Sequence, residues 1–321
     1  MRKKKMMNKK HYIKSLVMLA TMMLAASCGS DDFDDEPQNV ADNASLQEIR
    51  FNANVWRMMD GTRATTYDGG DLGSGSSFIA AAYVAGETTT YISPVQVNWD
   101  GDASKFIFSN GKHYWPMSDG LDFFAYMPVD PQSYITSGPS YTTARNPQFT
   151  CTMPMTNSGQ DLITEFVYAL KINQDKANQG VSGVDLAFQH PFTKIMMKLS
   201  STQADIHIDK IIFKSIKKVG TYTHNSGWAL SEDAAVNFEV TLDDDYEANA
   251  DLGTFLMIPQ AWAGQIEVNA SWNDWGDTPV EHTVTATIPA ITWQAGYSYT
   301  YTFTITLEDL VVNLTNFTEQ W

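Results

Sequence analysis

The chain has 321 residues, and its 21 Lys and Arg stand against 37 Asp and Glu, a formal net charge of −16. A surface this acidic repels nucleic acid and anionic lipid head groups, so neither is an expected partner. The two cysteines, Cys28 and Cys151, are too few for a disulfide framework, and the length suits two ordinary domains.

The amino terminus has the features of a secretory leader over residues 1–27. Six basic residues precede the mainly apolar segment Ile13–Leu24, a seventh, Lys14, lies at its start, and small residues follow it. A basic head, a short apolar core and small residues before a cut are typical of a signal peptide. The apolar segment has twelve residues, whereas a membrane span needs roughly 20, so a transmembrane helix fits less well.

The stretch Leu24–Cys28 resembles a bacterial lipobox, in which the thiol receives diacylglycerol and the chain is cut before the cysteine. An ordinary signal peptide with an incidental cysteine is the alternative. The resemblance predicts lipidation of Cys28 and an outer-membrane anchor made of several acyl chains. Loss of the leader removes its seven basic residues and leaves 14 against 37 acidic ones, a net charge of about −23.

Residues 28–45 are polar and acidic, without an apolar period, and are expected to be a solvated tether. The cluster Asp31–Glu36 also resembles a surface-export signal of some gut and oral bacterial lipoproteins.

The stretch Leu46–Met58 predicts a strand with one buried face. Four apolar residues alternate with polar ones at period two: Ile49, Phe51, Ala53 and Val55. The polar stretch that follows contains Arg63, which a trypsin-like protease can cut if the loop is exposed. On local chemistry alone, an ordinary loop arginine explains it better.

The rest of the chain reads as short strands separated by turn residues, without an amphipathic helix of twelve or more residues. Asn-Gly and Asp-Gly pairs such as Asn110-Gly111 suit tight hairpins. The spacing predicts an all-β fold of sandwich or barrel type. The first series of expected strands is Phe78–Ala85, Val95–Trp99, Lys105–Phe108, His113–Trp115, Leu121–Met127, Gln148–Met153 and Phe166–Ile172.

Residues 173–184 are polar and contain glycine, so the domain boundary is expected there. The predicted domains are 46–178, of which 46–63 is a removable strand, and 183–321. The second series of expected strands is Asp185–Phe188, Thr193–Leu199, His207–Phe213, Val236–Leu242, Thr254–Ile258, Gln265–Trp272, His282–Ile288 and Tyr297–Leu307. The last of these alternates aromatic and Ser or Thr residues, which predicts one core face and one wet face.

The tail has three apolar residues in step, Leu310, Val312 and Leu314. It is expected to form a further strand over 308–321, either within this molecule or in a neighbour.

The sequence carries no strong signal for an enzyme, a cofactor or a metal. It has no Gly-x-Ser-x-Gly elbow and no His-x-x-x-His or Cys-x-x-Cys pair. Asp205, His207 and Asp209 share one strand face, which a solvated surface explains better than a metal site. Asp243–Asp245 is expected to be a turn rather than a calcium loop.

Two residue types have both a structural and a functional interpretation. Cys151 lies in an alternating run and is expected to be a small buried residue rather than a nucleophile. Trp262, Trp272 and Trp275 crowd one region, where core packing is the main expectation and a glycan-binding platform the alternative.

Several segments together resemble the fimbrillin family, the lipoprotein-derived pilus subunits of gut and oral Gram-negative bacteria. The matching pieces, in chain order, are Gly61-Thr62-Arg63-Ala64-Thr65, Tyr114-Trp115-Pro116, Leu121–Pro128, Leu186–His190 with Thr193-Lys194-Ile195, Phe255–Gln260 and Ile291–Tyr297.

The resemblance implies two β-sandwich domains with a transthyretin-like, Greek-key-like topology. It also implies export as a surface lipoprotein and a cut by an Arg-specific protease between Arg63 and Ala64. Loss of the 46–58 strand then leaves a groove that a strand of another subunit fills, and Leu310, Val312 and Leu314 are the candidate donor residues. Because the tail is short, the resemblance is compatible with a stalk, tip, accessory or uncut anchor position within the pilus.

Two functions of different class follow. One is a non-enzymatic pilus subunit, polymerised by strand exchange, that acts in adhesion to a host or bacterial surface and resides in the fimbria after processing. The other is a monomeric surface lipoprotein that binds glycans for nutrient capture. An Arg-specific protease separates them, because only the first predicts assembly after the cut.

Overall fold

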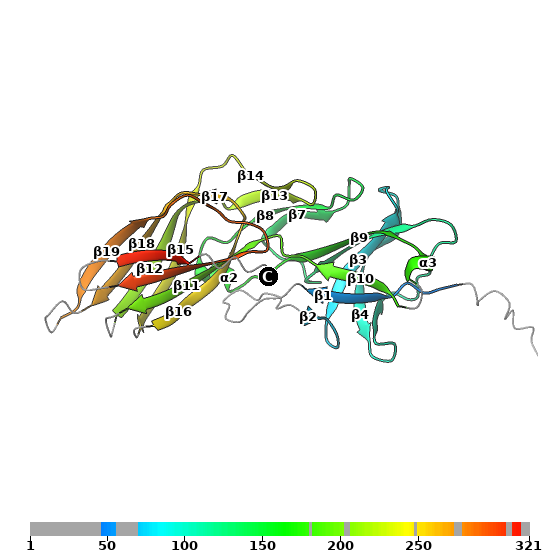
Figure 1. Ribbon diagram of the computed structural model, residues 1–321, viewed down its shortest axis with the longest axis horizontal. Coiled ribbons are helices and arrows are strands. Elements are labelled where there is room, and N and C mark those ends of the chain that lie inside the picture. The colour runs from blue at the N-terminus through cyan, green and yellow to red at the C-terminus, as the bar shows by residue number, and fades with distance from the viewer. Residues whose placement is uncertain are drawn as a thin grey trace, which may run out of the picture. The chain divides into compact units, whose positions relative to one another are not determined.

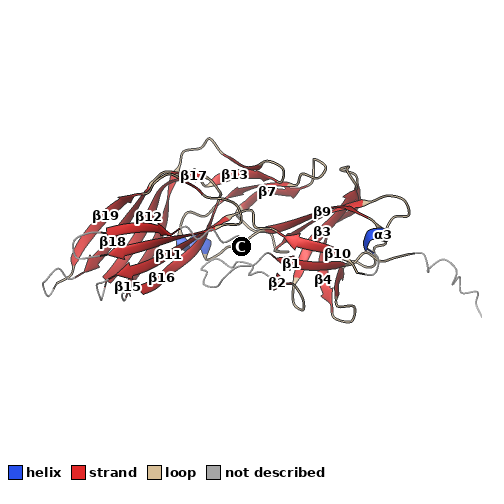
Figure 2. Ribbon diagram, in the orientation of Figure 1, coloured by secondary structure: helices blue, strands red, loops and turns tan. Residues whose placement is uncertain are grey.

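The computed structural model describes residues 46–55, 70–179, 182–201, 206–246, 249–272, 278–305 and 310–315. Strands make up most of these residues (Figures 1 and 2), which confirms the all-β prediction. Two four-residue helices occur among them, α2 (Asn157–Gln160) and α3 (Lys176–Gln179), and no helix in the described ranges is long and apolar enough to cross a bilayer. Leu46–Trp321 forms one compact unit.

The first sheet has eight strands. They are β1 (Phe51–Val55), β2 (Gly70–Asp71), β3 (Ser77–Val84), β4 (Thr90–Asp100), β5 (Lys105–Phe108), β6 (Leu121–Met127), β9 (Val167–Gln174) and β10 (Val184–Phe188). Their order is β10-β1-β5-β4-β3-β6-β9, with β2 paired to β1. Tyr168 in β9 and Gln189, which follows β10, exchange two backbone hydrogen bonds of 3.2 and 2.7 Å. The two ends of the sheet therefore meet, and the sheet wraps around its own apolar core.

Two four-stranded sheets form a sandwich in the second half of the chain. One contains β11 (Thr193–Ser201), β16 (Asn249–Met257), β21 (Ser298–Ile305) and β22 (Leu310–Thr315), in the order β16-β11-β21-β22. The other contains β12 (Ile206–Ile216), β15 (Val236–Tyr246), β18 (Gln265–Trp272) and β19 (Val280–Thr287), in the order β15-β12-β18-β19. Alternate residues of both sheets fill one shared core, which includes Phe213, Phe255 and Tyr301.

A fourth sheet links the two halves of the sequence. It consists of β14 (Gly227–Leu230), β13 (Val219–Thr223), β8 (Gln148–Thr152) and β7 (Ile135–Ser140), in that order. Strands β8 and β13 pair along five positions although they lie on opposite sides of the expected boundary at 173–184. An aromatic cluster that includes Phe149, Phe192 and Trp228 packs against this sheet. The short strands β17 (Ala261–Trp262) and β20 (Ile291–Thr292) pair separately.

Four sequence expectations differ from the structure. His113–Trp115 forms only an isolated bridge, between Tyr114 and Glu48. Asp243–Asp245 is not a turn but part of β15, where Asp243 takes a φ of +46° beside a register shift in the pairing with β12. The strand expected at 185–188 with the C-terminal series lies beside β1 in the first sheet. The outer face of β21 is not wet at its start, because Ser298 and Thr300 are both buried.

Candidate functional site

Strand β1 is an interior strand of the first sheet. It runs parallel to β10, with a register that extends from Phe51 opposite Val184 to Val55 opposite Phe188. On its other side it pairs antiparallel with β5 at Phe106 and with β2 near Val55. Its removal would therefore leave unpaired backbone groups on both sides of the gap.

The inward face of β1 is the face that the sequence predicts. Ile49, Phe51, Ala53 and Val55 are at most 6% exposed and belong to the core of the first sheet. The ring of Phe51 meets three other rings edge-on, at centroid distances of 5.9 Å to Phe78, 5.3 Å to Phe108 and 5.4 Å to Phe123. The structure thus places all four predicted residues together in one buried row.

The outward face of β1 is held by exposed polar contacts. The side-chain amide of Asn52 donates to the carbonyl oxygen of Ser182 at 2.9 Å and to a carboxylate oxygen of Asp185 at 2.7 Å. The ammonium group of Lys105 donates to Oδ1 of Asn52 at 2.5 Å. Exposed polar contacts contribute little stability, so the apolar face and the backbone pairing hold the strand.

The residues just before β1 are also fixed. The amide of Ile49 donates to the carbonyl oxygen of His113 at 2.8 Å, and the amide of Trp115 donates to Gln47 at 3.0 Å. On the far side, the amide of Val184 donates to Arg50 at 2.8 Å. The segment is therefore bonded to its neighbours from Gln47 through Val55.

The candidate donor strand lies in the second half of the fold. Leu310, Val312 and Leu314 belong to β22, which pairs antiparallel with β21 at the edge of its sheet. Val312 packs against the sandwich core, whereas Val311 is 44% exposed. The tail strand thus pairs within this molecule, one of the two arrangements that the sequence leaves open.

The predicted processing residues fall outside the described ranges. These are the leader, Cys28 and the acidic tether, together with Arg63 and Ala64. Arg63 lies in the sequence between β1 and β2, at residues 51–55 and 70–71.

Helix α2 closes two strand edges of the second-half sandwich, and no pattern in the sequence predicts this arrangement. The side-chain amide of Asn157 donates to the carbonyl oxygen of Thr241 at 2.7 Å and accepts from its amide at 3.3 Å. Gln160 makes the same two bonds with Leu256, at 3.0 and 3.1 Å. Thr241 is in β15 and Leu256 in β16, the edge strands on one side of the sandwich. That side cannot accept a further strand at these positions.

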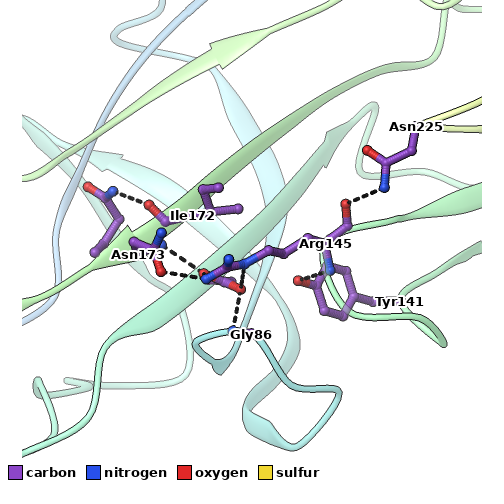
Figure 3. A network of polar contacts seen from close by, with 8 residues as sticks. Gly86, Tyr141, Arg145, Ile172, Asn173 and Asn225 are labelled. Atoms are coloured by element: carbon purple, nitrogen blue, oxygen red, sulfur yellow. Dashed lines mark hydrogen bonds and ion pairs between the residues drawn. The ribbon is translucent and has the colours of Figure 1, made fainter.

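A buried carboxylate joins the turn after β3, strand β9 and the loop between β7 and β8 (Figure 3). Asp122 in β6 accepts hydrogen bonds from the amides of Gly86 and Asn173, at 2.8 and 2.7 Å, and from the guanidinium of Arg145 at 2.9 Å. Burial alone raises the pKa of Asp122, but these hydrogen bonds outweigh it and lower that pKa below its usual value. The network stabilises the fold rather than offering a reactive group.

Cys151 behaves as the sequence predicts. It is a buried free thiol, and burial raises its pKa well above the usual value, which leaves little thiolate for chemistry.

A histidine on β12 gathers carboxylates around it. Nδ1 of His207 is 2.7 Å from Asp245, and Nε2 is 3.3 Å from Asp243 and 3.5 Å from Asp209. The ligand atoms of His207, Asp209 and Asp243 lie within 4.8 Å of one another. Asp205 lies outside the described residues. The groups are mostly exposed, and mutual ion pairing accounts for their arrangement.

Within the described ranges, the tryptophans are mainly core residues. Trp262 and Trp272 are buried at 3% and 5% exposure, so neither ring can stack on a sugar at the surface. Trp275, the third residue of the expected glycan platform, lies outside the described ranges.

The comparisons with known proteins agree with this architecture. The family model described as fimbrillin-like matches residues 62–321. Similar solved structures include a candidate cell adhesion protein of Bacteroides ovatus, a fimbrial protein of Bacteroides vulgatus and a candidate cell adhesion protein of Bacteroides uniformis.

These structures resemble the chain in fold at low sequence identity. In the same order, the TM-scores are 0.56, 0.57 and 0.53 and the identities 19%, 16% and 14%. The matches cover 86%, 84% and 87% of this chain and 98%, 99% and 99% of the other chains. No curated protein matches significantly. Because the family model spans most of the sequence, including nearly all of the described strands, the chain belongs to the fimbrillin-like family.

Proposed function

We propose that this protein is a structural subunit of a cell-surface pilus that acts in adhesion. It is exported as a lipoprotein on Cys28, released by an Arg-specific protease after Arg63, and assembled by strand exchange. Membership of the fimbrillin-like family supports the pilus role. The fimbrial and cell adhesion proteins of similar fold agree with it.

The buried strand β1 is the observation that carries the proposal. A cut after Arg63 separates β1 from the chain covalently and leaves every later strand on one polypeptide. The cut chain then holds β1 only through its buried face and its pairing with β10, β5 and β2. We call the space that β1 fills between β10 and β5 the slot. Burial of one large apolar side chain contributes about 1.5–3 kcal/mol, so an empty slot destabilises the subunit until another strand fills it.

The tail strand is suited to be donated. Strand β22 lies at a sheet edge, where its departure breaks one ladder and leaves the interior strands paired. A donated strand restores the missing ladder hydrogen bonds of a neighbouring subunit and places alternate side chains in its slot. In this arrangement Leu310, Val312 and Leu314 enter the neighbour, and the lipid leaves with the released segment.

Treatment of the purified 28–321 protein with an Arg-specific protease tests the proposal. We expect a new amino terminus at Ala64, after which a fluorescent peptide of residues 46–58 exchanges into the cut protein. The Arg63→Lys variant keeps the charge but should remain uncut and take up no peptide, and Arg57→Lys should behave like the parent. A protein that is cut at Arg63 yet takes up no strand peptide would contradict strand exchange. An uncut monomer that binds polysaccharide would favour the glycan-capture function.

A further inference from the structure

Within β1 itself the slot has three inward positions of different size, those of Phe51, Ala53 and Val55, and the buried Ile49 precedes them. Its first position holds the ring of Phe51, enclosed by Phe78, Phe108 and Phe123 with centroids 5.3–5.9 Å away. Phe51 is fully buried. A side chain smaller than an aromatic ring would leave a cavity there.

The other two positions hold the smaller side chains of Ala53 and Val55. The side chains of β10 that face the three positions increase in size from the first to the last. Opposite Phe51 stands Val184, opposite Ala53 stands the larger Leu186, and opposite Val55 stands Phe188. These three residues of β10 are buried in the same core. Because a well-packed core has little spare room, the second position admits only a small side chain.

The chain's own tail does not match this order of sizes. Leu310, Val312 and Leu314 would place leucine in the aromatic position and valine in the small one. The pattern Leu-x-Val-x-Leu reads the same in both directions, so reversal of the strand brings no improvement. A shift by one residue turns Asn313 inward, and burial of its amide without partners is costly.

We propose that the slot selects a strand of the pattern aromatic-x-small-x-Val from a different subunit, and discriminates against the tail of a second copy of this chain. The inference rests on the proposed function, because it concerns the strand that replaces β1 after the cut. It means that this subunit joins a pilus made of different subunits. Its slot accepts the strand of one kind of subunit, and its tail enters the slot of another kind.

Peptide competition tests the proposal. In the 28–321 protein, a site for a specific protease is inserted between residues 58 and 68, so release of β1 does not depend on Arg63. After cleavage, a fluorescent peptide of residues 46–58 is exchanged into the slot. Unlabelled peptides are then titrated, and displacement is followed by anisotropy. The competitors are the native tail 308–317 and the same peptide with Leu310→Phe, Val312→Ala and Leu314→Val.

A permuted tail serves as the matched control, with Leu310→Ala, Val312→Phe and Leu314→Val, so that its composition equals that of the redesigned peptide. We expect the redesigned peptide to displace the label at a concentration roughly tenfold or more below that of the native or permuted tail. Equal potency of the native and redesigned tails would overturn the selectivity and leave strand exchange intact. Failure of the cleaved protein to take up even the 46–58 peptide would overturn strand exchange, and with it this inference.

Discussion

Gln160 pairs with the backbone of Leu256 through both ends of its side-chain amide, at 3.0 and 3.1 Å. The amide thereby acts as one residue of an additional strand on the edge of β16. A third bond, from Nε2 to the carbonyl oxygen of Pro154 at 3.1 Å, holds the side chain in the short loop before α2. Gln160 is fully buried, so none of these groups has water as an alternative partner.

Replacement of Gln160 by Ala should destabilise the protein by about 2–4 kcal/mol, because it leaves the amide and the carbonyl of Leu256 buried without partners. Urea unfolding followed by tryptophan fluorescence measures the change. Asn157→Ala removes the equivalent pair on Thr241 at an exposed position and should cost only about 0.5–1 kcal/mol. If both variants lowered the free energy of unfolding equally, burial of the Gln160 pair would contribute no extra stability.

The Asp122 network predicts a stability that depends on pH. Because the folded-state pKa of Asp122 is lowered, its contribution is fully present above the unfolded-state pKa near 4 and is lost as the pH falls through the folded value. Asp122→Asn should therefore lower the free energy of unfolding at neutral pH, and the gap to the parent protein should narrow below about pH 4. Denaturant titrations across this range measure the gap. A gap for Asp122→Asn that stays constant across this range would refute the assignment.

His207 should titrate at higher pH than an ordinary histidine. The hydrogen bond to Asp245 is the main cause of its raised pKa, and Asp243 acts in the same direction. A raised folded-state pKa gives stability that is present below the unfolded value of about 6.5 and lost as the pH rises through the folded value. NMR titration of the imidazole provides the measurement. Asp245→Asn should move the pKa back toward its usual value, and a parent value at or below the usual one would contradict the geometry.

Cys151 should be inert until the protein unfolds. The Cys28→Ser variant leaves Cys151 as the thiol to be measured. A chromogenic disulfide reagent should leave the native protein unmodified near pH 8, because the thiol of Cys151 is buried and protonated. The same reagent should modify Cys151 fully in urea. Leu162→Cys places a second thiol at a position that is 85% exposed and should react at once. Rapid labelling of Cys151 in the native state would indicate that its sheet opens readily.

Local patterns were sufficient to predict many strands but not their partners. Lys105–Phe108, Leu121–Met127 and Gln265–Trp272 agree with the structure at both ends, because apolar residues at strand spacing are bounded there by turn or polar residues. Strand β14 escaped prediction because its four residues start with glycine and are too few to show a period. Asp243–Asp245 looks like a turn by composition, yet its neighbours across the sheet keep it in β15.

The candidate site divides in the same way. The period-two pattern from Ile49 to Val55 predicts the buried face of β1. The sequence around Phe51 does not predict its contacts with Phe78, Phe108 and Phe123. Those contacts form only when the sheet closes. The role of Gln160 is likewise invisible, since a lone glutamine in a loop carries no local signal of its partner.

The pairing of β1 with β10 joins Asn52 to Asp185 across 133 positions of the chain. Contacts so distant in sequence form slowly, because a long loop must close before they stabilise anything. Because a chain is made from its amino terminus, β1 appears first, but its parallel neighbour β10 follows only after most of the first sheet. Every newly made molecule therefore passes through an interval in which the position of β1 beside β10 is not yet closed. The order in which the strands fold thus bears on which strand arrives there first.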